Sequence, residues 1–276
     1  MKKDKISSIA LEVLFVLATV VIWIPLYYLL IGAFKGREDI VLNPLGINFS
    51  TLTLDNFANA WQRMDFFNSF VNTLIITVGA LLILVAFSAL AAFAISRIHW
   101  KVFTVYYAVI VALMVVPFIS CLLPLVRQLR GMGLYNTHLG AILVHAAWHL
   151  PFCIFLYEGF MKGIPKELEE AATIDGANTI QTFLLIFLPL IKPVTATCCI
   201  RSGMTIWNDF LVSSTMLNAS KTSTLIVSIN AFFGKYVNEY GFAFAGILLA
   251  TLPIALMFIF LQKYFVAGMI AGAVKG

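Results

Sequence analysis

The residues best suited to chemistry in this chain are polar side chains spaced along an apolar stretch between residues 190 and 211. Sites for small solutes combine apolar and aromatic faces with a few hydrogen-bonding groups. This stretch offers such a set, namely Arg201, Thr205, Trp207, Asn208 and Asp209. We interpret these residues as the candidate lining of a path for a small solute. A second interpretation of Trp207 stays open, because tryptophan often anchors a helix at the membrane interface.

Arg201 stands out because it lies near the middle of this stretch. An arginine at the centre of a membrane helix costs about 2.5–3.5 kcal/mol on insertion scales, so it needs water or a polar partner. The nearest acid of the stretch, Asp209, lies about two helical turns away. We expect Arg201 to face a watery cavity or a group on a partner, and a structural role against carbonyl groups stays open. A contact with substrate would favour an acidic sugar.

Two other sets of reactive side chains carry weaker signals. His138, His145 and His149 have the spacing of one helix face, but no carboxylate partner stands nearby in the sequence, so we expect no metal site. The cysteines lie in apolar segments without paired metal or redox spacing, and we interpret them as small buried side chains. They are Cys121, Cys153, Cys198 and Cys199.

The elements that position these residues are built for lipid. Of 276 residues, 61% are hydrophobic and only 11% are charged, whereas soluble proteins average about 25% charged residues. Backbone groups in lipid must be hydrogen-bonded within a segment, which excludes open strands. The sequence therefore predicts an all-α, polytopic membrane protein. It has six predicted transmembrane helices, Ile9–Phe34, Phe67–Ile95, Val102–Leu125, Leu139–Phe160, Leu190–Leu211 and Gly241–Phe265.

The charges near the first span predict the orientation. Lys2, Lys3 and Lys5 precede this span, and basic residues favour the cytoplasmic side. An even number of spans then places both termini in the cytoplasm. The first span is too long for the apolar part of a secretory signal. The net charge of +5 suits contact with lipid headgroups and offers no basic patch for nucleic acid.

A polar, helix-forming loop of residues 162–193 interrupts this apolar chain. Pro165 suits the first turn of a helix, and the acids that follow it are favoured by the helix dipole. Asp175-Gly176 is predicted to end this helix, because glycine readily adopts the left-handed conformation. Asn178 or Thr179 can cap a second helix. A short exposed helix of this kind fits the groove of a partner protein. Its acids are Glu167, Glu169 and Glu170.

The same loop carries a family resemblance. Glu170-Ala171-Ala172, followed by Gly176 and by Leu188-Pro189, resembles the EAA signature of binding-protein-dependent ABC importer permeases. Further stretches from Phe67 onward resemble the carbohydrate branch, and the likeness is strongest to the smaller permease subunit of maltose-type importers. These stretches are Met114–Phe118, Leu123-Pro124-Leu125, Gly133–Thr137, Trp207–Phe210, Gln262–Val266 and Ala271–Gly276.

The resemblance implies a domain organisation and a set of coupling residues. Residues 1–66 would form an N-terminal transmembrane helix and an external loop. Residues 67–276 would form the permease core, with five transmembrane helices, the coupling loop 162–193 and a cytoplasmic tail over 266–276. The coupling loop would contact a cytoplasmic ATPase, and the tail would reach the ATPase pair. The residues implied are Glu170, Ala171, Ala172, Asp175 and Gly176 in the loop, and Gly272 and Lys275 in the tail.

The resemblance also implies partners and a cell membrane of a prokaryote. The chain has no GxxxxGK[ST] phosphate loop, so we expect ATP and Mg²⁺ on two partner ATPase subunits. This chain would be a transport subunit with no cofactor and no enzymatic activity. A second permease subunit would complete a heterodimer, and an extracytoplasmic binding protein would deliver the sugar. The lipid bilayer surrounds the chain, and no nucleic acid is involved.

The predicted function is therefore import of a sugar or oligosaccharide by ATP-driven alternating access. Two alternatives stay open. One is a permease of the same family for an acidic sugar or a phosphorylated solute. The other is a secondary carrier coupled to an ion gradient, which acids inside the membrane would favour; no acid lies well inside a predicted span.

Overall fold

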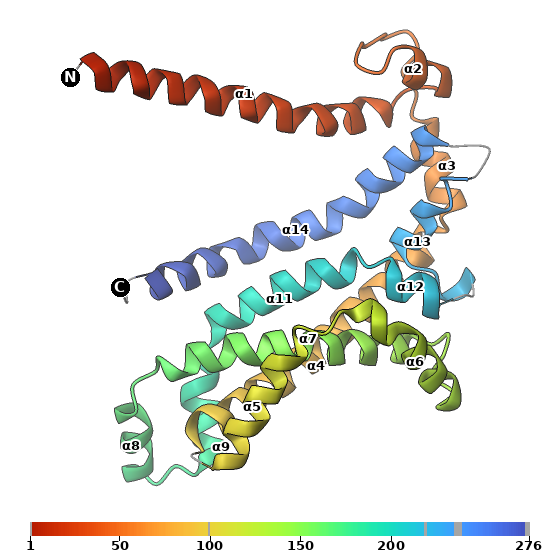
Figure 1. The fold of residues 1–276 in the computed structure, drawn as a ribbon. Helices are drawn as coiled ribbons and strands as arrows, with labels where there is room; N and C mark the ends of the chain where they lie inside the picture. Colours follow the sequence, from red (N-terminus) through yellow and green to blue (C-terminus); the bar gives the residue numbers. More distant parts are fainter. Residues whose placement is uncertain (1, 99, 218–219, 235–238, 274–276) are drawn as a thin grey trace. The chain divides into compact units, whose positions relative to one another are not determined.

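The computed structural model describes residues 2–98, 100–217, 220–234 and 239–273, and the regular structure in this part is helical apart from isolated β-bridge positions, among them a bridge between Lys35 and Leu52. The elements in chain order are α1 (Lys2–Gly32), α2 (Arg37–Leu42), α3 (Asp55–Arg63), α4 (Phe66–Arg97), α5 (Lys101–Leu113), α6 (Phe118–Gly131), α7 (His138–Lys162), α8 (Glu167–Ile174), α9 (Thr179–Thr182), the π-helix η1 (Phe183–Phe187), α10 (Leu188–Leu190), α11 (Lys192–Trp207), α12 (Leu211–Met216), the 3₁₀-helix η2 (Ser220–Thr222), α13 (Leu225–Asn230) and α14 (Tyr240–Ala273) (Figure 1).

The predicted all-α membrane architecture is confirmed. Four of the described helices are long and apolar enough to cross a membrane, and the number rises to six if each of two bent helix pairs counts as one span. The four are Leu11–Gly32, Phe66–Arg97, His138–Lys162 and Tyr240–Phe260, and the bent pairs are Lys101–Leu113 with Phe118–Gly131 and Thr179–Leu190 with Lys192–Trp207.

Contacts divide the chain into two compact units. Unit 1 contains residues 1–67 and 228–252, and unit 2 contains residues 68–227 and 253–276. The boundary between the units at 67/68 lies one residue after the predicted boundary at 66/67, and residues 228–252 belong to the same unit as the N-terminal segment. Small residues make this packing possible, because Gly241 lies against the side chain of Asn56 and Gly246 lies against Met64.

The segment predicted as an external loop before residue 67 contains the helices α2 and α3 of unit 1. The buried ammonium group of Lys35 donates a hydrogen bond to the carbonyl oxygen of Asn43 at 2.6 Å. Asn56 donates to the carbonyl oxygens of Ala33 and Lys35 at 2.9 and 2.8 Å. Buried polar groups need such partners, and these hold α2 and α3 against the end of α1. By contrast, α1 exposes its apolar side chains from Leu11 to Tyr27, as a lipid-facing helix does.

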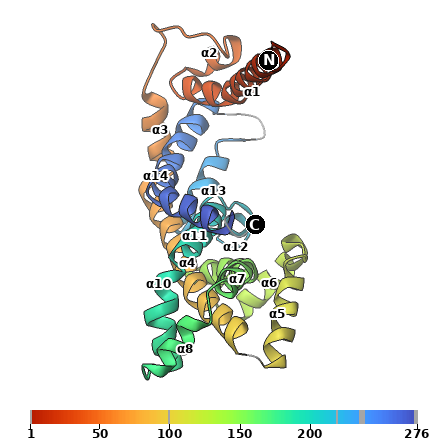
Figure 2. The same ribbon diagram turned by 90° about the vertical axis from the view of Figure 1, so that its left-hand side faces the viewer.

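Unit 2 is organised around α7. This helix packs against α5, α11 and α12, and its fully buried Cys153 and Tyr157 belong to the main apolar core. The hydroxyl group of Tyr157 donates to Thr195 Oγ1 on α11 at 2.8 Å. The short helix α8 lies past the C-terminal end of α7 in both views (Figure 1, Figure 2). The interior of unit 2 therefore links the membrane helices directly to the 162–193 loop.

The predicted third span, Val102–Leu125, is wrong as a single straight helix. The chain bends by 104° between α5 and α6. Pro117 lies at the break in an extended conformation, with φ −68° and ψ 126°. Proline has no N–H to donate and disfavours helical geometry in the residue before it. The helix is therefore broken at Pro117, although the hydrophobic composition of Val102–Leu125 predicted one continuous helix.

The fifth and sixth predicted spans also have shifted bounds. Leu190–Leu211 is observed as α11, with a 69° bend from the preceding helix at Ile191, between Pro189 and Pro193. Pro193 takes one of the first two positions of α11, where its missing N–H costs nothing. The helix of the sixth span extends beyond the predicted end at Phe265, because α14 continues to Ala273, whereas the membrane-spanning part found among the described residues is Tyr240–Phe260. The predicted tail 266–276 is thus helical as far as it is described.

Gly140 tests the packing at the start of α7. A Cβ atom on Gly140 would collide with the carbonyl oxygen of Leu134, a backbone atom, whereas a Cβ on Gly159 of the same helix would meet open space. We expect Gly140→Ala to lower stability by about 1–3 kcal/mol, as overpacking does. Gly159→Ala is the matched control and should leave stability unchanged or raise it. Thermal unfolding of the purified chain in detergent measures both, and equal midpoints would contradict the packing described here.

Candidate functional site

The helix α8 is bounded as its residues predict. Gly176 ends it in the left-handed conformation, with φ +82°. The N–H of Ala177 donates to the carbonyl oxygen of Ala172 at 2.9 Å, and that of Gly176 donates to Thr173 at 3.1 Å. These two bonds form a Schellman motif, which satisfies the last carbonyl groups of a helix. The predicted glycine stop is confirmed, and it keeps α8 short.

The second helix of the loop begins at Asn178, which resolves the predicted choice between Asn178 and Thr179. The Asn178 side chain accepts a hydrogen bond from the N–H of Gln181 at 2.9 Å. The Gln181 side chain in turn accepts from the N–H of Asn178 at 2.8 Å. This reciprocal capping box fixes the start of α9. The chain then passes through η1, whose Phe187 is buried in the core of unit 2.

A buried arginine ties this loop to the membrane helices. Arg97 is the last residue of α4, and its side chain is only 5% exposed. Its Nη2 donates to the carbonyl oxygens of Met161 and Ile164 at 2.8 and 2.9 Å. Its Nε lies 3.5 Å from Glu169 Oε2 on α8, and its guanidinium group lies 4.9 Å from the ring centre of Phe187. One cation thus contacts the ends of α4 and α7, the helix α8 and η1.

The predicted coupling residues lie on different faces of α8. Ala172 is buried against unit 2, whereas Glu170 and Ala171 are exposed. Of the large apolar side chains of α8, Ile174 is the more exposed, at 86%, against 42% for Leu168. Ala172, Asp175 and Gly176 line a cavity of about 370 Å³ together with residues of α9 and η1. The loop members of the predicted set are therefore close together. Gly272 lies in α14, and Lys275 lies outside the described residues.

A second candidate site surrounds Arg201, for which the sequence predicted a watery cavity or a polar group on a partner. Arg201 donates from Nη1 to Thr205 Oγ1 at 2.6 Å, and its guanidinium group lies 5.2 Å from the ring centre of Phe152. Both side chains line a cavity of about 380 Å³, which we call the midspan cavity. Trp148 and His149 of α7 and the break between α5 and α6 complete its wall.

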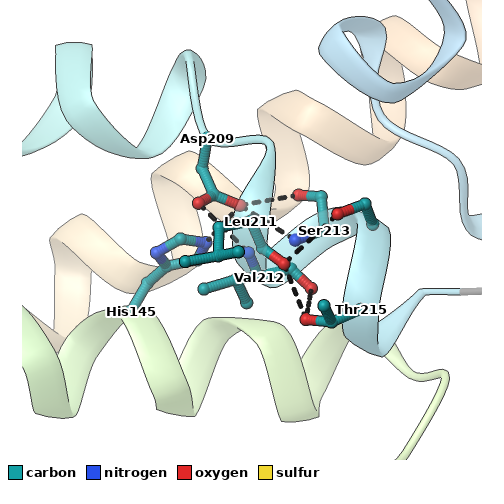
Figure 3. A network of polar contacts seen from close by, with 7 residues as sticks. His145, Asp209, Leu211, Val212, Ser213 and Thr215 are labelled. Carbon is teal, nitrogen blue, oxygen red and sulfur yellow. Dashed lines mark hydrogen bonds and ion pairs between the residues drawn. The ribbon is translucent and has the colours of Figure 1, made fainter. Parts of the chain in front are cut away.

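Asp209 lies just after the end of α11 and is held by several polar contacts (Figure 3). Its carboxylate accepts hydrogen bonds from the N–H groups of Val212 and Ser213 at 3.3 and 2.9 Å and from the Ser213 hydroxyl at 3.0 Å. Its Oδ2 also lies 3.7 Å from Nε2 of His145 on α7. The expectation that no carboxylate accompanies the histidines is therefore wrong. Because α12 packs against α7, a residue distant in sequence reaches His145.

The five predicted pathway residues divide into cavity-lining, exposed and buried residues. Arg201 and Thr205 line the midspan cavity. Thr205 also lines, with Asp209, an adjoining cavity of about 180 Å³, which we call the outer cavity and which shares Trp148 and His149 with the first. Asn208 is exposed and donates to the carbonyl oxygen of Met204 within α11. Trp207 is buried, and its ring lies edge-on to Phe70 of α4 at 5.9 Å.

The histidines do not form a metal centre in the described part of the chain, where no group of three or more metal-binding side chains occurs. His138 Nε2 lies 2.8 Å from Asn72 Oδ1, and the rings of His145 and His149 stack with centres 6.3 Å apart. Of the cysteines, Cys153 and Cys198 are buried as expected, whereas Cys121 and Cys199 are half-buried. Cys121 lines the midspan cavity.

Sequence reasoning missed Arg97, Trp148, His149 and Phe152 as site residues. Arg97 follows a long apolar run and precedes a turn, so it has the sequence context of an ordinary basic residue at a cytoplasmic boundary. The signal for its role is the acidic cluster of α8, but only folding brings Glu169 to it. Trp148 and Phe152 are four residues apart, on one helix face, and this spacing is also that of a packed or lipid-facing surface.

Comparison with known proteins gives consistent matches along the chain. The family described as binding-protein-dependent transport system inner membrane component matches residues 85–271. The melibiose/raffinose/stachyose import permease protein MelC of Bacillus subtilis (strain 168) is 40% identical over 92% of this chain and 92% of its own length. The probable starch degradation products transport system permease protein AmyC of Thermoanaerobacterium thermosulfurigenes is 36% identical, also over 92% of each chain.

A solved structure shares the fold. It is described as a bacterial ABC transporter involved in the import of the acidic polysaccharide alginate. One of its chains superposes with a TM-score of 0.83, covering 96% of this chain and 98% of that chain. The sequences are 21% identical, so this likeness concerns the fold alone. It agrees with an all-helical membrane architecture over nearly the whole length.

Arg97 gives this site a direct test. We expect Arg97→Gln to loosen α8, because hydrogen bonds and an ion pair to a buried cation are lost together. Hydrogen exchange of residues 167–174, followed by mass spectrometry, should accelerate about tenfold, the effect of about 1.4 kcal/mol. Arg130→Gln is the matched control, because exposed Arg130 lies over the Tyr135 ring in the segment that precedes α7. Equal exchange of α8 in the two variants would contradict the role of Arg97.

Proposed function

The chain belongs to the family of inner membrane components of binding-protein-dependent transport systems, and we propose that it is the permease subunit of an ATP-driven importer of neutral oligosaccharides. The observation that carries the proposal is the 40% identity with an oligosaccharide import permease over 92% of both chains. The family match covers residues 85–271, a range that includes both the 162–193 loop and the midspan cavity.

On the cytoplasmic side, we propose that α8 is the helix that docks on a partner ATPase. Its exposed face presents Glu170, Ala171 and Ile174, and an apolar side chain as exposed as Ile174 is typical of a contact surface. Arg97 and the buried Ala172 support the opposite face. Gly272 and Lys275 in the C-terminal segment would add a second contact. ATP and Mg²⁺ would bind to the ATPase pair, and this chain would hold no cofactor.

The remaining partners follow from this arrangement. With six spans, the 162–193 loop lies on the same side of the membrane as both termini. We therefore propose that both termini are cytoplasmic, because the loop would then face a cytoplasmic ATPase. A second, different permease subunit would complete the passage through the membrane. The family description names a binding-protein-dependent system, and we propose that an extracytoplasmic sugar-binding protein delivers the cargo. Nucleotide-driven movement of α8 would then switch the passage between inward and outward access.

The passage itself would run along α11. We propose that Arg201, Thr205, Asn208 and Asp209 face it, since three of them line the two adjoining cavities and Asn208 is exposed. Trp207 would contribute by fixing the outer end of α11 against Phe70 of α4. The carboxylate of Asp209 is already hydrogen-bonded to α12 and lies beside His145. Asp209 would therefore shape the outer cavity and would not bind the solute directly.

Neutral oligosaccharides are the cargo class that the relatives support best. The names of the two relatives refer to melibiose, raffinose and stachyose and to starch degradation products. Arg201, which has no carboxylate partner among the described residues, favours an acidic sugar as the second candidate. The carboxylate of Asp209 in the adjoining cavity opposes it. An ion-coupled carrier is disfavoured by membership of a binding-protein-dependent family.

Transport in vesicles tests the proposal. The complete complex would be reconstituted from this chain, its partner permease, the ATPase and the binding protein. We expect uptake of raffinose only when ATP is enclosed on the ATPase side and the binding protein is present on the other. The matched control encloses a non-hydrolysable ATP analogue. Uptake driven by an ion gradient without ATP would contradict the importer, and uptake restricted to uronate oligosaccharides would select the second candidate.

Glu170 tests the proposed docking face. We expect Glu170→Lys to lower raffinose uptake about tenfold, because a reversed charge in a contact costs about 1.4 kcal/mol or more. The fold of unit 2 should be unaffected, since Glu170 is exposed. Glu38→Lys makes the same change on exposed α2 and serves as the control. Uptake per ATP hydrolysed is the measurement, and normal coupling in an assembled Glu170→Lys complex would refute the docking assignment.

A further inference from the structure

The midspan cavity has the composition of a sugar-ring site. The faces of Trp148 and Phe152 supply aromatic surface, and Arg201, Thr205 and His149 supply hydrogen-bonding groups. Small-molecule sites combine an apolar, aromatic lining with a few placed polar groups in this way. The described contacts of Arg201 use one hydrogen bond, to Thr205, whereas a guanidinium group has five N–H donors. Most of its donors are therefore available to a ligand.

The position of the cavity suits a solute that crosses the membrane. His149 lies near the middle of α7 (His138–Lys162), and at 1.5 Å per residue both ends of this helix are about 16–20 Å away. Arg201 lies in the middle part of α11. A hydrocarbon core about 30 Å thick places both side chains near the bilayer centre. A cation at this depth is costly unless it faces water or a polar ligand, and the cavity provides the space for either.

The size of the cavity limits the ligand. Its volume of about 380 Å³ lies at the lower end of the range for small-molecule sites, about 300–1,000 Å³. A single sugar ring matches this volume better than a complete trisaccharide does. The adjoining outer cavity of about 180 Å³ shares Trp148, His149 and Thr205, so a longer chain can continue outward from the first ring.

The charges favour a neutral ring. Arg201 is the one permanently charged residue in the lining of the midspan cavity. Asp209 lines the outer cavity, and its carboxylate would repel a uronate there. Sugar hydroxyl groups, by contrast, accept hydrogen bonds from Arg201 and can donate to the ring nitrogen of a neutral His149. The combined lining suits hydroxyl groups on a ring with an apolar face.

We propose that the midspan cavity is a binding site, within this chain, for one neutral hexopyranose ring of the transported oligosaccharide. Arg201 and Thr205 bind the hydroxyl groups, and Trp148 and Phe152 cover the apolar face of the ring. The inference rests on the proposed function and deepens it, because it assigns a substrate contact to this subunit itself. Residues at the break between α5 and α6, among them Met114 and Val116, form part of the cavity wall.

Native cysteines provide the readout. Cys121 lines the midspan cavity, whereas Cys199 does not, and both are half-buried. The assembled complex, without ATP, would be treated with N-ethylmaleimide, and alkylation of each cysteine would be followed by mass spectrometry. Raffinose is the probe. We expect raffinose to slow alkylation of Cys121 and to leave alkylation of Cys199 unchanged.

Two variants and a matched control assign this protection to the site. Arg201→Met should abolish the protection of Cys121. Thr205→Val removes the hydrogen bond between Thr205 and the charged Arg201, and it should raise the raffinose concentration needed for protection about tenfold. Thr197→Val is the control on the same helix. Thr197 and Thr205 both donate to the carbonyl oxygen four residues earlier, but only Thr205 lines the cavity. Protection should therefore survive in Thr197→Val.

The outcomes separate this inference from the proposed function. A complex that imports raffinose without protecting Cys121, or that keeps full protection in Arg201→Met, would overturn the site and leave the function standing. Protection by digalacturonate but not by raffinose would overturn the neutral class of ligand. A complex that imports neither raffinose nor any other sugar with ATP would overturn the proposed function, and the site with it.

Discussion

The buried guanidinium group of Arg97 is the constraint on which the working parts of unit 2 depend. A cation with 5% exposure must be compensated, and Arg97 obtains this from carbonyl groups at and just after the end of α7, from Glu169 and from the ring of Phe187. The carbonyl end of a helix favours a positive charge. Because Arg97 and its partners belong to α4, α7, α8 and η1, a displacement of α8 would expose or unpair the cation unless α4 and α7 move too. The helix α8 is therefore mechanically tied to α4 and α7.

The helix α7 connects the contacts of Arg97 to the midspan cavity. One end of α7 contacts Arg97, its middle supplies Trp148, His149 and Phe152, and the half nearer its start places His145 beside Asp209. α11 is joined to it by the Tyr157–Thr195 hydrogen bond and by packing around Cys153 and Ser202. Opposite them, the break at Pro117 separates α5 from α6. A rigid helix facing an interrupted one is an arrangement in which movement at one end changes the width of the space between them.

Local signals in the sequence predicted much of this structure, and long-range contacts account for what was missed. The spans follow from hydrophobicity, and the ends of α8 and α9 follow from Gly176 and Asn178, whose effects need only neighbouring residues. Arg97 with Glu169 and His145 with Asp209 are pairs that only the fold brings together. Pro117 was visible, but the apolar run around it outweighed the proline in the prediction of a straight span. Of the predicted pathway residues, Trp207 shows the ambiguity best, because burial against Phe70 and the lining of a passage call for the same side chain.

The central claim is that Arg97 transmits nucleotide-driven movement of α8 to the midspan cavity. Spin labels would be attached at Val116→Cys, which lines the cavity, and at Met204→Cys, on the exposed side of α11. In the assembled complex with the native cysteines replaced, pulsed electron–electron double resonance would measure the distance between the labels and so report the width of the midspan cavity. The account predicts that ATP changes the distance between the labels when Arg97 is present. It also predicts that an Arg97→Gln complex, still bound to its ATPase, keeps the nucleotide-free distance. An identical ATP-dependent change in both complexes would contradict the account.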